Sequence, residues 1–283
     1  MNARTLSLIT GLVTGLSLAP SALAVSGCTN SYLFGNYAMQ FSGVSAPGVA
    51  SGIGGVAVPS SLSTAFQTAA ANGGNSSAPI AGAARLNLDG SGNITGYSSE
   101  NMAGQWLQGN ITGTYTVNTD CTFSFALTDA GGNTETFSGT LVSQSRSAMI
   151  LQMDAGSGVS GTLQSVRGIC QTSDLSGAFG LQYAGTTVGT SNSPYSSVGV
   201  VSLDGQGNLT AAENRFGGGS SSQVQSVGTM VVNPDCSFTM ALSSVSATGG
   251  ALNFFGIAIA DNKQLLIVQS DAATAVTGAM AMQ

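Results

Sequence analysis

The two halves of this chain repeat one another, and this duplication constrains the fold more than any other feature of the sequence. The clearest block reads LDGSGNIT at 88–95 and LDGQGNLT at 203–210. Three further blocks recur in the same order, matching 28–41 with 170–183, 114–121 with 229–236 and 150–154 with 267–271. A chain of 283 residues built in this way predicts two tandem domains of one architecture, at 25–168 and 169–283.

The spacing between the copies changes once, which places an insertion in the first copy. The offset between matched residues falls from 142 to 115 after the first block, so 27 additional residues lie within about 43–81. Inside this range, residues 60–73 begin at serines and end on Asn-Gly, a pattern that predicts a short helix. The insertion is either a surface loop that the scaffold tolerates or a lid over a site.

Apolar and polar residues alternate through both copies, which is typical of half-buried β-strands. Tyr37, Met39 and Phe41 share one face, and Asp-Gly and Asn-x-Asp turns separate such runs. The first copy has eight predicted strands, near 35–42, 82–88, 94–101, 110–118, 121–129, 134–143, 147–154 and 159–166. The second has the same eight, near 177–185, 197–203, 209–215, 223–232, 236–244, 251–260, 264–271 and 274–282. Short connections favour an all-β fold of two tandem eight-stranded antiparallel up-and-down barrels, with β-sandwiches as the alternative.

The first 24 residues have the pattern of an export signal. Arg4 precedes an apolar stretch at 6–18, and Ala22-Leu23-Ala24 forms a small-x-small cleavage site. No later segment is long and apolar enough to predict a transmembrane helix. We therefore expect a periplasmic or extracellular protein that has no transmembrane segment after the signal peptide is cleaved.

Four cysteines in an exported chain indicate disulfide bonds. Each copy has one cysteine before its first strand and one before its fifth, so the duplication favours the pairs Cys28–Cys121 and Cys170–Cys236. A competing interpretation is that the VSGC segment ending at Cys28 is a lipobox that anchors the protein to lipid. Lipidation of Cys28 would leave Cys121 unpaired, and we therefore favour the disulfide.

The scarcity of charge limits the possible functions. Twelve acidic residues, six basic residues and no histidine make up a chain that is 6% charged, where a typical domain has about 25%. A chain of this charge does not hold nucleic acid electrostatically. Without histidine it also lacks the commonest metal ligand and general base. We predict no catalytic residue, no metal site and no cofactor.

A few polar residues occupy matching positions in both copies and are candidates for ligand contact. Gln152 and Asp154 share one strand face, and their counterparts are Gln269 and Asp271. If that face points inward, each barrel holds an amide and a carboxylate near one mouth. Gln40 and Gln182 form a third matched pair, either as structural hydrogen-bonding groups or as ligand contacts. We expect the single tryptophan, Trp106, to serve in packing.

The block GTYTVNTDC at 113–121, with LDGSGN upstream, resembles a group of exported bacterial proteins of uncharacterised function that carry one or two such units. The resemblance implies a secreted β-barrel-like domain and supplies no activity or catalytic residue. Calycin-like barrels are similar in strand count only, and this likeness of fold does not transfer a function.

Three functions follow as hypotheses. The first is a non-catalytic exported protein that binds a small apolar ligand or acts at the cell surface. The second is an isomerase or cyclase that uses a buried carboxylate, Asp154 or Asp271. The third is a structural surface protein, which filled barrel interiors would favour. The sequence leads to no prediction of the oligomeric state.

Overall fold

The computed structural model describes residues 27–46, 77–142, 147–166, 168–189, 191–245, 250–259 and 263–283. The predicted signal peptide at 1–24 and the predicted helix at 60–73 lie outside these residues. In the described part of the chain, no helix has the length and apolar character needed to cross a membrane.

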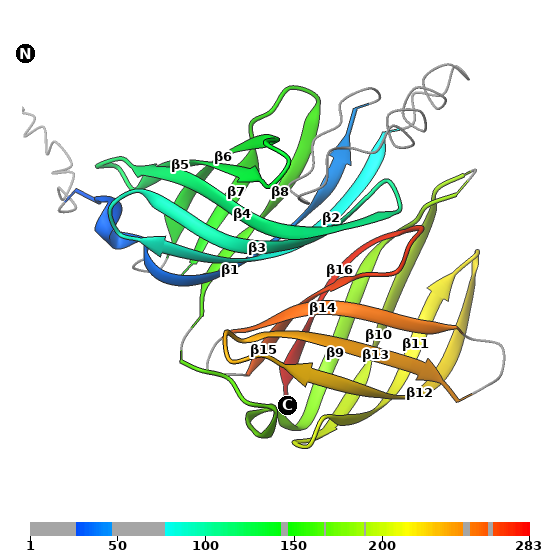
Figure 1. The fold of residues 1–283 in the computed structure, drawn as a ribbon. Coiled ribbons are helices and arrows are strands. Elements are labelled where there is room, and N and C mark those ends of the chain that lie inside the picture. The colour runs from blue at the N-terminus through cyan, green and yellow to red at the C-terminus, as the bar shows by residue number, and fades with distance from the viewer. Residues whose placement is uncertain are drawn as a thin grey trace, which may run out of the picture.

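The chain forms two closed antiparallel barrels of eight strands each, in which every strand pairs with its neighbours in sequence and the last pairs with the first (Figure 1). Barrel 1 follows the short 3₁₀ helix η1 (Asn30–Tyr32) and consists of β1 (Phe34–Ser45), β2 (Ala78–Asp89), β3 (Asn93–Met102), β4 (Gln105–Val117), β5 (Thr122–Asp129), β6 (Thr134–Val142), β7 (Ser147–Gln152) and β8 (Ser157–Ser165). Barrel 2 follows η2 (Thr172–Asp174) and consists of β9 (Ser176–Thr187), β10 (Ser193–Asp204), β11 (Asn208–Gly217), β12 (Ser220–Val232), β13 (Ser237–Ser244), β14 (Ala251–Ile259), β15 (Gln264–Gln269) and β16 (Thr274–Met282). The tandem-barrel prediction is confirmed, and the sandwich alternative is wrong.

The repeated LDGxGN block forms the hairpin turn between the second and third strands of each barrel. Asp89 Oδ1 accepts hydrogen bonds from the backbone amides of Ser91, Gly92 and Asn93 at 2.7–2.9 Å. Hydrogen bonds from Asn93 and from the other amides lower the pKa of this exposed carboxyl to about 2. Asp204 closes the matching turn of barrel 2 in the same way. Side-chain closure of these turns explains why the block recurs.

Several strands are longer than the alternation predicted, and β2 shows why. The first nine residues of β2 are all buried, so polar and apolar positions do not alternate there. One face of this strand points into barrel 1, and Ala81 and Ala83 on the other face pack against barrel 2. β1 and β2 consequently extend through 43–45 and 78–81, which were assigned to the insertion.

Aromatic side chains fill much of both barrel interiors. In barrel 1, the rings of Phe125 and Phe137 stack with their centroids 4.8 Å apart, and Phe41 and Phe123 extend the cluster. In barrel 2, the corresponding aromatic cluster surrounds Tyr183. Its ring lies 5.5 Å from that of Phe254 and 5.8 Å from that of Tyr195. Burial of these rings is a major part of the apolar stabilisation of each barrel.

One disulfide lies in each barrel. Cys28 is bonded to Cys121 and Cys170 to Cys236, with Cα–Cα distances of 5.1 and 4.9 Å. Each bond ties the segment before the first strand to the turn before the fifth. The predicted pairing is confirmed, with Cys28 in a disulfide.

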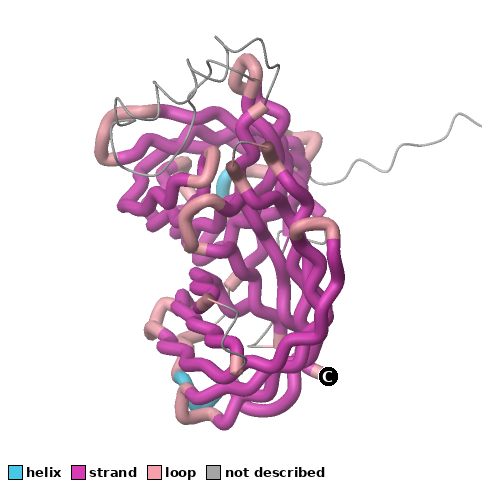
Figure 2. Tube along the Cα trace, turned by 90° about the vertical axis from the view of Figure 1, so that its right-hand side faces the viewer, coloured by secondary structure: helices cyan, strands magenta, loops and turns pink. Residues whose placement is uncertain are grey.

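The barrels pack directly against each other (Figures 1 and 2). The outer surface of β1, β2 and β3, here called the β1–β3 face, contacts the outer surface of β14, β15 and β16, the β14–β16 face. Small residues on the β1–β3 face permit the close approach, and Ala38, Ala81 and Ala83 are completely buried. Arg85 Nε also donates to the backbone oxygen of Asp235 at 2.7 Å.

Candidate functional site

The predicted pair in barrel 1 is brought together at one end of the barrel. Gln152 is buried, and its Nε2 donates to Asp154 Oδ2 at 3.0 Å. Asp154 also accepts hydrogen bonds from the backbone amide of Thr136 at 3.0 Å and from its hydroxyl at 2.7 Å. The carboxylate therefore holds the start of β6 to the end of β7.

The pair in barrel 2 repeats this geometry. Gln269 Nε2 donates to Asp271 Oδ2 at 2.9 Å, and Asn253 donates to the same carboxylate from its backbone amide at 2.9 Å and from Nδ2 at 2.7 Å. One difference separates the two copies. Gln152 Oε1 accepts a hydrogen bond from Ser157, whereas the buried Gln269 Oε1 has no partner among the described residues.

The third matched pair diverges between the copies. Gln40 points outward from β1 and donates through Nε2 to the backbone oxygens of Ile267 and Gly278 in barrel 2, at 2.9 and 2.8 Å. Gln182, at the same place on β9, is exposed. Gln40 thus joins the barrels, and its counterpart faces solvent.

Two glutamates that were not predicted as site residues lie inside barrel 1. Glu100 on β3 is 0% exposed and Glu135 on β6 is 3% exposed. Burial raises the pKa of Glu135 well above its usual value, and the nearby carboxyls of Glu100, Asp154 and Asp129 raise it further. This end of the barrel can therefore hold a proton. Within the described ranges, no group of three or more His, Cys, Asp or Glu side chains is arranged to hold a metal ion.

The sequence contains a signal for these buried acids. Glu135 is two residues from the inward-pointing Phe137 and therefore belongs to the same strand face. Glu100, Asp129 and Glu135 are also the acids of barrel 1 that the second copy lacks. The second copy has Arg215, Ser244 and Leu252 at these positions.

Barrel 2 instead contains a buried glutamate that is paired with an arginine. Arg215 Nη2 lies 2.8 Å from Glu213 Oε1, and the hydroxyls of Tyr183 and Ser197 each donate to Glu213 Oε2 at 2.8 Å. Burial raises the pKa of Tyr183, and the adjacent Glu213 raises it further. The interiors of the two copies have thus diverged in charge.

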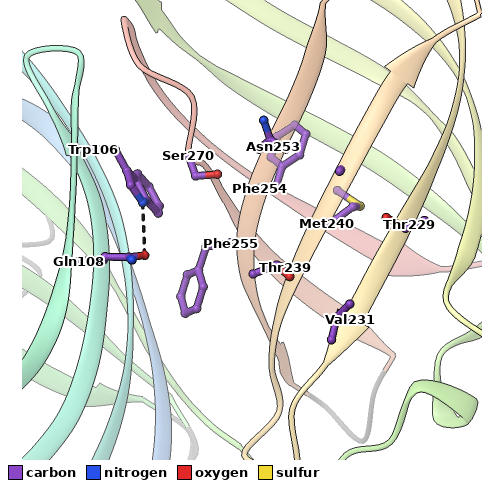
Figure 3. A pocket seen from close by; sticks show the side chains of 11 residues that line it. Trp106, Gln108, Thr229, Val231, Thr239, Met240, Asn253, Phe254, Phe255 and Ser270 are labelled. Carbon is purple, nitrogen blue, oxygen red and sulfur yellow. Dashed lines mark hydrogen bonds between the residues drawn. The ribbon is translucent and has the colours of Figure 1, made fainter.

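A groove of about 270 Å³ lies between the barrels and is here called the inter-barrel groove (Figure 3). Trp106 and Gln108 project into it from β4, and Phe255 and Asn253 approach from β14. The remaining lining residues are Thr229, Val231, Thr239, Met240, Ala241, Phe254 and Ser270. None of these residues carries a charge. The groove therefore presents apolar rings beside neutral amides and hydroxyls.

The aromatic residues at the groove are held in place from both barrels. The rings of Tyr97 on β3 and Phe255 lie 6.0 Å apart, and Phe255 is 7% exposed. Trp106 Nε1 donates to Gln108 Oε1 at 3.4 Å, and the half-buried indole packs against the apolar core of barrel 2. The packing role expected for Trp106 is present, together with a surface that faces the groove.

Comparison of the two copies shows that the aromatic residues of the groove are specific to it. β4 and β12 have equal lengths, so Trp106 corresponds to Ser221 in the second copy. Phe255 corresponds to Ser138 in the first copy. Aromatic residues thus replace serine where the barrels meet. This difference between the repeats is a signal in the sequence for the groove.

The fold defines a tandem, disulfide-bonded antiparallel β-barrel protein. No family model matches the chain, and no curated protein matches it. Among solved structures, the isotype 1 transferrin binding protein B of serogroup B Neisseria meningitidis is similar at 7% sequence identity and a TM-score of 0.33, with 88% of this chain and 76% of that chain covered. Because the TM-score is below 0.5, this likeness carries no inference about ligand or function.

Proposed function

We propose that this chain is a non-catalytic exported protein that binds a small, uncharged and largely apolar ligand in the inter-barrel groove. The observation that carries the proposal is the meeting of Trp106 and Phe255 in a groove without a charged lining residue. Ligand sites commonly combine apolar and aromatic walls with a few polar groups that orient the ligand. The two disulfides suit an oxidising compartment, in agreement with export.

The polar groups of the groove favour a neutral ligand. Gln108 contributes an amide, and Thr239 and Ser270 contribute hydroxyls that donate or accept hydrogen bonds. A charged ligand would lose hydration without gaining an opposite charge. A ligand with a flat apolar face and one or two polar atoms matches this lining.

The barrel interiors favour a ligand site outside them. The clustered rings of Phe41, Phe123, Phe125 and Phe137 occupy barrel 1, and the cluster around Tyr183 occupies barrel 2. A ligand entering either barrel would have to displace closely packed rings. A ligand in the inter-barrel groove needs no such rearrangement.

Titration with Nile red, an uncharged planar dye, tests the proposal. We expect saturable binding at one site per chain, an increase in dye emission and quenching of Trp106, the only tryptophan of the protein. Thr239→Arg places a bulky charge in the groove and should weaken binding about tenfold or more.

Ser124→Arg is the matched control, because Ser124 is the exposed counterpart of Thr239 on barrel 1 and lies outside the groove. This variant should bind the dye as the wild type does. Equal loss of binding in both variants, or dye binding without quenching of Trp106, would contradict the assignment to the groove.

A further inference from the structure

The contact between the barrels joins two different faces of one repeated unit. Barrel 1 uses its β1–β3 face, and barrel 2 uses its β14–β16 face. Because the barrels are copies, each also has the face that its partner uses. Two faces are therefore left uncovered by the described residues: the outer surface of β9, β10 and β11, here called the β9–β11 face, and that of β6, β7 and β8, the β6–β8 face.

Both uncovered faces present apolar side chains to solvent. On the β9–β11 face, Val198 is 56% exposed and Phe216 is 40% exposed. On the β6–β8 face, Met149 is 66% exposed and Leu151 is 50% exposed. Leu151 corresponds to Val268, which is completely buried in the contact between the barrels. The same positions are thus covered in one copy and open in the other.

The donor and acceptors of one polar contact between the barrels also recur on the two free faces. Gln40 bonds the backbone oxygens of Ile267 and Gly278, which are paired residues on β15 and β16. The counterpart of Gln40 is the exposed Gln182. The counterparts of its two acceptors are Ile150 and Gly161, which are paired in the same register on β7 and β8.

The place that would receive Gln182 is open. Ile150 and Gly161 line a groove of about 430 Å³ on the outside of barrel 1, together with the exposed Met149. The groove borders the contact between the barrels, because Gln40 and Thr277 also line it. In barrel 2 the equivalent position holds the Gln40 amide. An exposed amide donor thus lies on one free face of the chain, and the two residues that would accept its hydrogen bonds line a groove on the other.

We infer that a second copy of this chain binds in head-to-tail fashion, with the β9–β11 face of one molecule on the β6–β8 face of the next. Gln182 of one copy would then donate to the Ile150 and Gly161 carbonyls of the other. The contact between two molecules would have the same arrangement as the contact between the two barrels of one molecule. Contacts of this heterologous kind extend into open chains or close into rings.

The composition of the faces supports a second copy as the occupant. The outward side chains of the β9–β11 face include Gln182, Val198, Val200 and Phe216, and those of the β6–β8 face include Val142, Met149, Leu151 and Ser160; all are uncharged. Apolar patches exposed on exported proteins commonly mark interaction sites. The inference is independent of the ligand proposed for the inter-barrel groove.

Sedimentation velocity over a concentration series tests the inference. We expect the sedimentation coefficient of the wild-type protein to rise with concentration. Val198→Glu and Leu151→Glu each place a charge on one free face, and each should raise the dissociation constant at least tenfold. Ile169→Glu is the matched control. Ile169 is 76% exposed but lies in the connection between β8 and β9, outside both faces. This variant should associate as the wild type does.

Mixing the two face variants distinguishes a head-to-tail contact from a symmetric one. Val198→Glu retains its β6–β8 face, and Leu151→Glu retains its β9–β11 face. Each variant alone should be monomeric, whereas an equimolar mixture should form a 1:1 dimer and nothing larger. A wild-type protein that stays monomeric throughout the series, or a mixture that stays monomeric when the wild type associates, would overturn the inference.

Discussion

The buried carboxyl of Glu135 makes the stability of barrel 1 dependent on pH. Its pKa is raised in the folded protein by burial, then by Glu100, Asp154 and Asp129. In the unfolded chain the carboxyl ionises at an ordinary pH of about 4.3. The folded state therefore binds more protons than the unfolded state above that pH. Stability from this group is complete below about pH 4.3 and is lost as pH rises toward the folded pKa.

Glu135→Gln should remove this dependence. The amide keeps the size of the side chain without its charge, so the variant should be more stable than the wild type at pH 8 and nearly equal to it at pH 4.5. Urea unfolding at several pH values measures the difference as a change in midpoint. Glu213→Gln is the comparison, because it leaves Arg215 without its ion-pair partner and should destabilise by about 3–5 kcal/mol at neutral pH. Parallel pH profiles for wild type and Glu135→Gln would contradict the assignment.

The recurring elements were predictable because their turn chemistry is local. The Asp89 turn requires only an aspartate followed by glycines and asparagine, and the repeat shows the same pattern at Asp204. The extension of β2 to Ala78 was not predictable from alternation, because a second barrel buries its outer face. The residues at which a strand begins and ends thus depend on packing against other parts of the chain.

The candidate site was only partly predictable, for a related reason. The Gln152–Asp154 and Gln269–Asp271 pairs come together as their spacing indicated, yet their carboxylates bind neighbouring backbone and side-chain donors. Glu135 is not among the predicted residues because the second copy has Leu252 at its position, so the repeat does not mark it. The groove at Trp106 likewise depends on how one barrel lies against the other, which neither copy encodes alone.

The disulfide in each barrel joins the segment just before η1 or η2 to the turn before the fifth strand, and it should contribute strongly to stability. The bonded cysteines are 93 and 66 residues apart, and loop-closure entropy assigns about 4 kcal/mol to each bond. Replacing Cys170 and Cys236 together by serine should therefore lower the melting temperature, as should replacing Cys28 and Cys121. Calorimetry of the two double variants measures the effect. An unchanged melting temperature would contradict a stabilising role for that disulfide.

At the scale of the whole molecule, association and ligand binding use separate surfaces. The inter-barrel groove lies between β4 and β12–β14, whereas the free faces are formed by β6–β8 and β9–β11. The Val198→Glu variant should therefore bind Nile red with unchanged affinity while it associates more weakly. Parallel titration and sedimentation of this variant measure both properties. Loss of both together would show that the two surfaces are coupled.

The positions of the disulfides also determine how the molecule would lengthen under tension. Force applied at the two ends cannot extend the chain between Cys28 and Cys121 or between Cys170 and Cys236 while the bonds are intact. Residues 122–169 and those after Cys236 remain free to unravel. At about 3.5 Å per residue, the first of these stretches adds roughly 160 Å. A molecule fixed at a cell surface would thus lengthen by a limited amount, and more than half of each barrel's chain would stay closed until the bonds are reduced.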